Sequence, residues 1–359
     1  MQSSRREFLK RVVVGSAATV VPGYAQQQVQ PKQAKTQKAI PRWRGFNLLE
    51  MFTMHSRGDF REDDFKWIRD FGFNFVRFPA CYRLWIEDGD DYKINEAMLA
   101  KLDRGIDLAN KYGLHVSLNF HRGPGYSVNA EFTEPHSLWK DKAALDAFCF
   151  HWQLMAKRYR GISKDKLSFD LINEPPSVGN EMSRQDHERV VRTTVDAIRQ
   201  ISPDRLIVAD GLSWGREPMP ELADLGIAQS TRAYEPMFIS HAGASWVNSQ
   251  DYPPPAWPGH GWDRSRLEEH YAPWADLARE GVGVHCGEGG AYNKTPHEVV
   301  LRWLRDVLEI LTSHGIGLAL WNFRGSFGIL DSARTNVQYE DFHGHKLDRK
   351  LLALLQEFA

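Results

Sequence analysis

The chain has 359 residues and a formal net charge of −1, and 42% of its residues are hydrophobic. This length and composition predict a globular protein of one large domain or two ordinary ones. A nearly neutral chain lacks the excess of basic residues that nucleic acids or anionic membrane surfaces attract. Its three cysteines are too few for a disulfide framework, which excludes the small disulfide-stapled class of proteins.

The first 25 residues have the pattern of an export signal. Arg5-Arg6 is a twin-arginine pair, a mildly apolar run follows at residues 12–21, and Gly23-Tyr24-Ala25 is a small-residue cleavage site. Residues 26–41 are rich in Gln and Lys without hydrophobic periodicity, which predicts a disordered linker. We therefore expect twin-arginine (Tat) export to the periplasm or the medium, and a folded domain over residues 42–359.

From residue 43 onward, apolar strand patterns alternate with amphipathic helix patterns. Strands are predicted at residues 45–50, 73–79, 115–121, 167–174, 206–211, 230–235, 281–288 and 315–323. Helices are predicted at residues 63–71, 95–112, 141–160, 184–201, 264–280, 296–314 and 346–358, with only a short helix at 217–226. This alternation predicts an α/β protein with a single (β/α)8 TIM barrel, rather than a doubly wound sheet. The first strand is followed by no Gly-x-Gly-x-x-Gly, which argues against a dinucleotide-binding fold.

Polar and aromatic side chains gather at the carboxyl ends of these predicted strands. In a barrel of this class, catalytic groups lie at that end, where the loops after the strands converge. Random placement would scatter such residues among helices and strand interiors, so their clustering predicts one functional site at the rim of the barrel. The strand-end residues are Glu50, Arg77, His121, Asn173, Glu174, Tyr234, Glu288, Trp321 and Asn322.

Two of the strand ends carry a glutamate. Residues 167–174 read as an apolar strand that delivers Asn173 and Glu174 to the rim, and Pro175-Pro176 ends it abruptly. Residues 281–290 again read as strand, acid and glycine turn, with Glu288 as the acid. Strand alternation also places Cys286 on the same face as Glu288. Two strand-end carboxylates on one sheet are what retaining glycoside hydrolysis requires, one as acid/base and one as nucleophile.

This pattern resembles glycoside hydrolase family 5, a family of cellulase-like, retaining (β/α)8-barrel glycosidases. The resemblance extends from Trp43 to the C-terminus, and its most specific parts are Asn173-Glu174-Pro175 after an apolar strand and the strand-seven Glu288. It implies that Glu174 is the acid/base, a task that needs a pKa raised by burial and by the neighbouring carboxylate. It implies that Glu288 is the nucleophile, which attacks the anomeric carbon as a carboxylate.

The resemblance also assigns substrate or support roles to five further residues. Arg77 would favour the charged form of the nucleophile, and Tyr234 would hold the nucleophile by its hydroxyl. Asn173 would hydrogen-bond the sugar 2-hydroxyl, a contact that strengthens in the transition state. Trp321 would form the aromatic platform under the sugar, and His121 would bind substrate on strand three.

One position departs from the family pattern. Many members carry His two residues before the strand-six tyrosine, where this chain has Arg232. The departure either changes the hydrogen-bond network inside the barrel or shifts the register of strand six. The segment from His241 to Trp246 still matches a loop found in part of the family. Loop tryptophans either line further subsites or pack; they are Trp139, Trp246, Trp257 and Trp262.

The expected function is hydrolysis of a β-linked polysaccharide, with an endo-β-1,4-glucanase (cellulase) as the leading case. β-Mannan, β-1,3-glucan and other β-glycosides remain alternatives, because fold and acid pair do not separate them. A non-catalytic carbohydrate-binding barrel is another, although both acids are present. A metal-dependent hydrolase is disfavoured, since strand one lacks His-x-His and His343-Gly344-His345 falls after the last strand. We expect no cofactor or metal, and a monomer that binds an oligo- or polysaccharide but no nucleic acid and no membrane.

Overall fold

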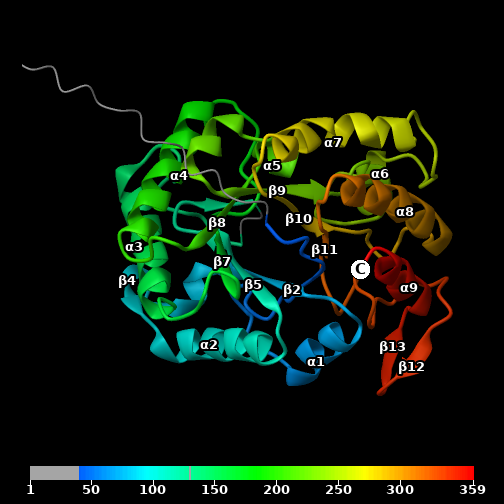
Figure 1. Ribbon diagram of the computed structural model, residues 1–359, viewed down its shortest axis with the longest axis horizontal. Coiled ribbons are helices and arrows are strands. Elements are labelled where there is room, and N and C mark those ends of the chain that lie inside the picture. The colour runs from blue at the N-terminus through cyan, green and yellow to red at the C-terminus, as the bar shows by residue number, and fades with distance from the viewer. Residues whose placement is uncertain (1–39, 129–130) are drawn as a thin grey trace, which may run out of the picture. The chain divides into compact units, whose positions relative to one another are not determined.

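The computed structural model describes residues 40–128 and 131–359 and has the predicted (β/α)8 architecture (Figure 1). The predicted signal, residues 1–25, and residues 26–39 of the predicted linker lie outside the described residues. Neighbouring strands pair in parallel and in chain order, and a parallel bridge between Cys286 and Leu318 closes the ring. The barrel strands are β1 (Gly45–Asn47), β2 (Phe75–Cys81), β5 (His115–Gly123), β7 (Leu167–Asp170), β8 (Leu206–Asp210), β9 (Ala228–Ala233), β10 (Val284–Gly289) and β11 (Ala319–Leu320).

Every predicted strand is present, but β1, β7, β8, β10 and β11 are shorter than predicted, β7 and β11 by the most. β11 has two residues, and β7 ends at Asp170, four residues before Glu174. The chain beyond β7 still follows its neighbours, because Leu171 N donates to Val208 O at 3.0 Å and Asn173 N donates to Phe120 O at 3.0 Å. Glu174 therefore reaches the rim as predicted, although in irregular backbone rather than in a strand.

Helices form an outer ring around the strands (Figure 1). Polar side chains cap the N-termini of α2, α4, α7 and α9: for example, Asn95 accepts from Met98 N at 3.1 Å, and Ser183 forms a capping box with Asp186. Between β8 and β9 lie only the four-residue helix α5 (Leu212–Gly215) and a short 3-10 turn, Pro220–Leu225, which confirms the predicted weak link. The main helices are α1 (Glu62–Asp70), α2 (Glu96–Lys111), α3 (Lys142–Arg158), α4 (Arg184–Arg199), α7 (Arg264–Arg279), α8 (His297–Ser313) and α9 (Arg349–Glu357).

The sequence patterns missed several short elements in the loops. Each is too short, or too rich in charged residues, to show a clear hydrophobic period. In the hairpin β12–β13, His343 lies in the turn and His345 is the first residue of β13. The missed elements are β3 (Ile86–Glu87), β4 (Asp90–Ile94), α5 (Leu212–Gly215), β6 (Tyr126–Ser127), α6 (Met237–Ser240), β12 (Glu340–Phe342) and β13 (His345–Leu347).

An aromatic floor closes the end of the barrel opposite the strand-end glutamates. Trp43 stacks on His115 with ring centroids 4.2 Å apart and on Phe75 at 5.2 Å. His285 from β10 packs against the same Phe75 at 4.7 Å. Burying one such aromatic side chain stabilises the fold by about 1.5–3 kcal/mol. The floor is not wholly apolar, because His115 of β5 also contacts Ser168 of β7, with 2.9 Å between Nε2 and Oγ.

The described residues contain neither a disulfide bond nor a helix suited to a membrane. Cys81, Cys149 and Cys286 are all free thiols. Within the described ranges, every helix is too short or too polar to cross a bilayer.

Candidate active site

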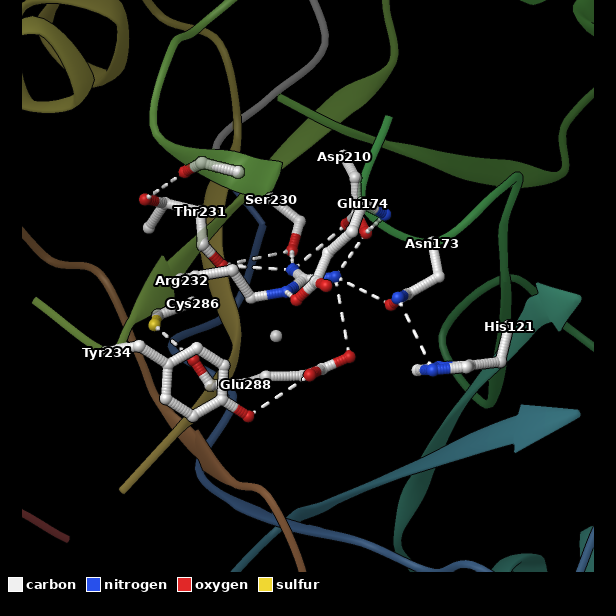
Figure 2. A network of polar contacts seen from close by, with 12 residues as sticks. His121, Asn173, Glu174, Asp210, Ser230, Thr231, Arg232, Tyr234, Cys286 and Glu288 are labelled. Carbon is white, nitrogen blue, oxygen red and sulfur yellow. Dashed lines mark hydrogen bonds and ion pairs between the residues drawn. The ribbon is translucent and has the colours of Figure 1, made fainter. Parts of the chain in front are cut away.

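Arg77, Asn173, Tyr234 and Glu288, four of the predicted site residues, meet at the rim, and Figure 2 shows the last three. Arg77, fully buried on β2, donates from Nη1 to Glu288 Oε1 at 2.6 Å and from Nη2 to Asn173 Oδ1 at 3.0 Å. Tyr234 donates its hydroxyl to Glu288 Oε2 at 3.1 Å. Both oxygens of the Glu288 carboxyl group are therefore held, one by a cation and the other by a phenol.

A β-bulge aims Glu288 into the barrel. The register of β10 against β9 shifts between Cys286 and Glu288. Gly287 faces the inside of the barrel, since a Cβ at this position would lie 3.2 Å from Arg232 Nη1. Cys286 faces the surrounding helices, because it belongs to the larger core cluster that includes Tyr271 of α7. Regular alternation would turn Glu288 outward, but the extra residue of the bulge re-aims it. The prediction that Cys286 and Glu288 share a face is therefore wrong.

Glu174 is held in a strained backbone conformation at the edge of the same site. Its φ of 48° lies in the left-handed region, which costs a non-glycine residue on the order of 1–3 kcal/mol. Two hydrogen bonds fix the peptide groups on either side: Glu174 N donates to Asp210 Oδ2 at 2.9 Å, and Tyr126 donates its hydroxyl to Glu174 O at 2.6 Å. These hydrogen bonds hold the backbone of Glu174 in its left-handed conformation and so fix the direction of its side chain.

Arg232 contacts both strand-end glutamates (Figure 2). Its Nε donates to Glu174 Oε1 at 3.0 Å, and its Nη2 lies 3.5 Å from Glu288 Oε1. Strand six keeps its register, because Arg232 pairs with Glu288 across the sheet and Tyr234 still reaches the Glu288 carboxyl group. The departure from the family pattern therefore changes the hydrogen-bond network and leaves the strand in place.

Two buried acids that sequence reasoning did not select complete this network. Asp170 accepts from Arg77 Nε at 2.7 Å, and Asp210 forms an ion pair with Arg232. Burial and the charge of Asp210 raise the pKa of Asp170 to about 7, against the opposing effect of Arg77. The sequence did contain signals for both acids. Asp170 is a charged residue inside the apolar run 167–172, and Asp210 lies at the end of the predicted strand 206–211. The site thus packs four carboxyl groups around two guanidinium groups.

The Glu174 carboxyl group has a pKa raised to about 7. Burial is the largest cause, the negative charge of Glu288 is the next, and Asp210 adds to them, whereas Arg232 acts in the opposite direction. A carboxyl group with this pKa carries a proton in a large part of the population at neutral pH. This is the direction that a general acid requires.

Two adjoining cavities meet at these residues, and both are lined by Glu174, Tyr234, His241 and Trp246. The first cavity has a volume of about 370 Å³ and the second of about 520 Å³. The first is further lined by residues such as Val128, Trp214, Arg216, Glu235, Met237 and His270. The second is further lined by residues such as Phe52, His121, Arg122, Glu288, Trp321 and Asn322.

His121 and Trp321 both lie in the second cavity, beside Phe52. The ring of Phe52 is 4.7 Å from His121 and 5.3 Å from Trp321. His121 approaches Asn173 at 3.5 Å between Nε2 and Nδ2, and burial with the nearby cations lowers its pKa well below the ordinary value. His121 is therefore a neutral imidazole. The seven predicted site residues all lie at this rim, while Phe52 was not predicted.

The loop tryptophans divide into lining and packing residues. Trp246 is 48% exposed and lines both cavities, and Trp214, which was not predicted, is 40% exposed in the first. Trp139 and Trp257 are buried, and Trp257 donates its ring nitrogen to Asp306 at 2.8 Å, so both are packing residues. Trp262 lines neither cavity.

Glu50 is a strand-end acid that lines neither cavity. Burial raises the pKa of its carboxyl group to about 7, and the neighbouring Asp64 adds to the effect. Asp64 itself is held by Arg324, whose Nε lies 2.9 Å from both carboxylate oxygens.

The two histidines of the His-x-His sequence have structural partners. His343 stacks on Trp67 with ring centroids 5.3 Å apart, and His345 Nδ1 lies 2.8 Å from Asp331 Oδ2. Within residues 40–128 and 131–359, no group of three or more His, Cys, Asp or Glu side chains is arranged to hold a metal ion.

Comparisons with known proteins agree with this geometry. The family model for cellulase (glycosyl hydrolase family 5) matches residues 32–326. Cellodextrinase A of Ruminococcus flavefaciens is 27% identical over 273 residues, which cover 71% of this chain and 76% of the relative. Endoglucanase C of Acetivibrio thermocellus is 25% identical over 310 residues, which cover 78% of this chain and 88% of the relative.

Among solved structures, a crystal structure of a glycoside hydrolase superposes with a TM-score of 0.83. It is 40% identical to this chain, and the match covers 88% of this chain and 99% of that one. The family match spans most of the sequence, and the matched segment carries both rim glutamates. The chain therefore belongs to glycoside hydrolase family 5, and it is a glycosidase.

Proposed function

We propose that the protein is a retaining β-glycosidase that cleaves a β-1,4-glucan internally, with Glu288 as nucleophile and Glu174 as acid/base. The observation that carries the assignment is a contrast between Glu174 and Glu288. Both carboxyl groups contact the guanidinium group of Arg232, but their other surroundings differ. Glu288 accepts from Arg77 and Tyr234, which suits a carboxylate, whereas Glu174 has its pKa raised to about 7. Two neighbouring acids in such different environments are the pattern of an acid/base assignment.

In the first step, Glu288 attacks the anomeric carbon while Glu174 protonates the departing glycosidic oxygen. The bond between the anomeric carbon and that oxygen breaks, and an ester forms between the sugar and Glu288. Arg77 and Tyr234 keep the attacking carboxylate in place, with contacts at 2.6 and 3.1 Å. Positioning of this kind converts a bimolecular encounter into an oriented reaction.

In the second step, Glu174 takes a proton from water, and the resulting hydroxide oxygen attacks the anomeric carbon. The ester breaks, Glu288 leaves as a carboxylate, and the sugar is released with net retention. Asn173, held by Arg77 at 3.0 Å and by Arg232 at 2.9 Å, is the side chain proposed to bind the sugar 2-hydroxyl. Trp321 is the proposed platform below the ring in the second cavity.

The shape of the cleft supports internal cleavage of a polymer. Glu174 lines both cavities, so the proposed acid/base adjoins two spaces, each with room for sugar units. The exposed Trp214 and Trp246 in the first cavity offer flat apolar faces to sugar rings, as Trp321 does in the second. The similarity to an endoglucanase and a cellodextrinase favours β-1,4-glucan over β-mannan, β-1,3-glucan and other β-glycosides.

Reducing-sugar release from four polymers tests the substrate. The full chain is incubated with carboxymethyl-cellulose, mixed-linkage β-glucan, β-mannan and laminarin, with Glu288→Gln as the matched control. We expect release from the first two, and loss of more than about four orders of magnitude in the variant, since the nucleophile is gone. Release from β-mannan or laminarin alone would make that polymer the substrate in place of β-1,4-glucan. No release from any polymer by a folded protein would favour short β-glycosides as substrates or a non-catalytic binding function.

Two further proposals concern the whole chain. We propose Tat-dependent export, supported by Arg5-Arg6 and the apolar run after them. Replacing both arginines by lysine should retain the protein in the cytoplasm, and unchanged export would contradict the proposal. We also propose that the enzyme is a monomer, which light scattering during size-exclusion chromatography checks.

A further inference from the structure

Arg232 uses its whole guanidinium group within the active site (Figure 2). Nε donates to Glu174 at 3.0 Å, and Nη2 donates to Asn173 at 2.9 Å. Nη1 donates to Ser230 Oγ at 2.9 Å and to Asp210 Oδ1 at 3.1 Å, and Nη2 pairs with the other Asp210 oxygen. Because a guanidinium is rigid and planar, these contacts together leave it one orientation.

An imidazole at this position would act differently. It has two ring nitrogens, so it could not bind Asp210, Asn173 and Glu174 together, and it is largely neutral at neutral pH. A guanidinium is charged at every working pH. Arg232 thus places a permanent positive charge 3.0 Å from a carboxyl group that must hold a proton to act as an acid.

We propose that Arg232 is a positioning residue for the acid/base: anchored on Asp210, it holds the Glu174 carboxyl group opposite the nucleophile and opposes its protonation. This proposal rests on the roles proposed above for Glu174 and Glu288. The charge opposes protonation because a cation within 4–6 Å favours the ionised form of a carboxyl group. The anchor matters because Asp210 also binds the Glu174 backbone, at 2.9 Å.

Among the charged groups around Glu174, Arg232 is the cation that forms an ion pair with its carboxyl group. Arg216, which lines the same cavity, forms its ion pair with Glu235 instead. The negative charges of Glu288 and Asp210 both raise the pKa of Glu174. The positive charge of Arg232 lowers that pKa and so opposes the two acids. The titratable and charged groups facing Glu174 are Tyr126 from β6, Asp210 from β8, Arg232 and Tyr234 from β9, Glu288 from β10, and Arg216, Glu235, His241 and His270 from the cleft wall.

The same contact suits the second step of the reaction. Once Glu288 is an ester, it carries no charge, so its contribution to the raised pKa of Glu174 disappears. Arg232 remains beside Glu174 and favours the carboxylate, which is the form that takes a proton from water. Arg232 therefore opposes the protonated form of Glu174 in the first step, where Glu288 and Asp210 offset its charge, and favours the carboxylate form of Glu174 in the second step.

The pH dependence of kcat/KM tests the proposal in the full chain, on the polymer that the wild-type enzyme hydrolyses. In Arg232→Gln the alkaline limb should move up by at least about one pH unit, because the cation is lost. Arg232→Lys keeps a charge and should return the limb toward that of the wild type. An unmoved limb in Arg232→Gln, even with a lower rate, would overturn the proposal.

Arg205 provides a matched control. It is a buried arginine that donates to the carbonyl oxygens of Leu167 at 2.8 Å and Ile162 at 2.9 Å, outside the active site. Arg205→Gln should lower thermal stability and leave the alkaline limb in place. A shift in this control equal to that of Arg232→Gln would mean that the limb reports general loosening of the barrel, which also contradicts the proposal.

A substrate-independent titration covers the case in which Arg232→Gln does not fold, since the substitution takes from Asp210 the closer of its two arginine partners. NMR of protein labelled with 13C at the glutamate carboxyl carbons, with Glu174→Gln to assign the signal, gives the pKa of Glu174 directly. That pKa should be higher in the double variant Asp210→Asn/Arg232→Gln, which removes the buried ion pair as a unit, than in Asp210→Asn alone, and an equal or lower value would overturn the proposal. Full activity in Glu174→Gln would instead refute the acid/base assignment, independently of Arg232.

Discussion

The floor and the rim of this barrel are built by the same strands but contain opposite chemistry. At the floor, Trp43 and Phe75 enclose His115 and His285, and the four rings pack at 4.2–5.9 Å. At the rim, four carboxyl groups are balanced by two guanidinium groups. Apolar burial stabilises the fold, whereas buried charges cost desolvation unless they are paired. The comparison indicates that stability is concentrated at the floor and reactivity at the rim.

After the loss expected for Glu288→Gln, the largest effect should again come from the rim, in Glu174→Gln. Without a general acid, kcat/KM on the polymer should fall by about 10²–10⁴-fold, while thermal stability stays within a few degrees of the wild type. On an aryl β-glycoside with a good leaving group, the first step needs little acid help and should be nearly normal. Steady-state kinetics on both substrates measure this contrast, and an equal loss on both would contradict the assignment.

At the floor, Trp43→Ala should produce the reverse result. Removing this buried ring should lower the free energy of unfolding by about 3–5 kcal/mol, because a cavity is left under the barrel. Chemical denaturation measures the loss. The kcat of the folded fraction should change less than threefold, and a collapse of kcat in a folded protein would break the separation between floor and rim.

The pH dependence of stability sharpens the same contrast. Burial lowers the pKa of His115 to about 4, below the ordinary value of 6.5. The unfolded chain therefore binds a proton that the folded chain does not, so this stability is present above pH 6.5 and is lost as the pH falls toward 4. The loss should approach about 3 kcal/mol, and denaturant titrations from pH 7 to 4 should show a shallower decline in His115→Gln.

The smallest of these effects is expected for Tyr234→Phe at the rim. It removes the 3.1 Å hydrogen bond to Glu288 Oε2 and leaves the ring in place. A hydrogen bond to a charged group contributes about 1.5 kcal/mol or more, so kcat should fall by roughly tenfold. KM and the melting temperature should change little, and a large fall in melting temperature would assign Tyr234 to structure instead.

Periodicity and strand-end chemistry predicted the barrel strands, the main helices and the rim location of the site residues. They failed where the backbone is irregular, because a period-two pattern assumes a regular strand. The bulge before Glu288 reverses the predicted face of Cys286, and β7 ends before Glu174. The contacts of Arg232 also lay beyond the sequence, since they join β9 to β8, to β10 and to the segment after β7, where Glu174 lies 58 residues before Arg232.

The central claim, that Glu288 forms a covalent intermediate with Glu174 as its acid/base, is tested most directly by the stereochemistry of the first product. Proton NMR follows hydrolysis of a soluble β-linked oligosaccharide in real time, before the new reducing end mutarotates. The account predicts that the β-anomer appears first and the α-anomer only later, as two displacements at one carbon restore the configuration. An α-anomer as the first product would show a single displacement by water and would contradict the account.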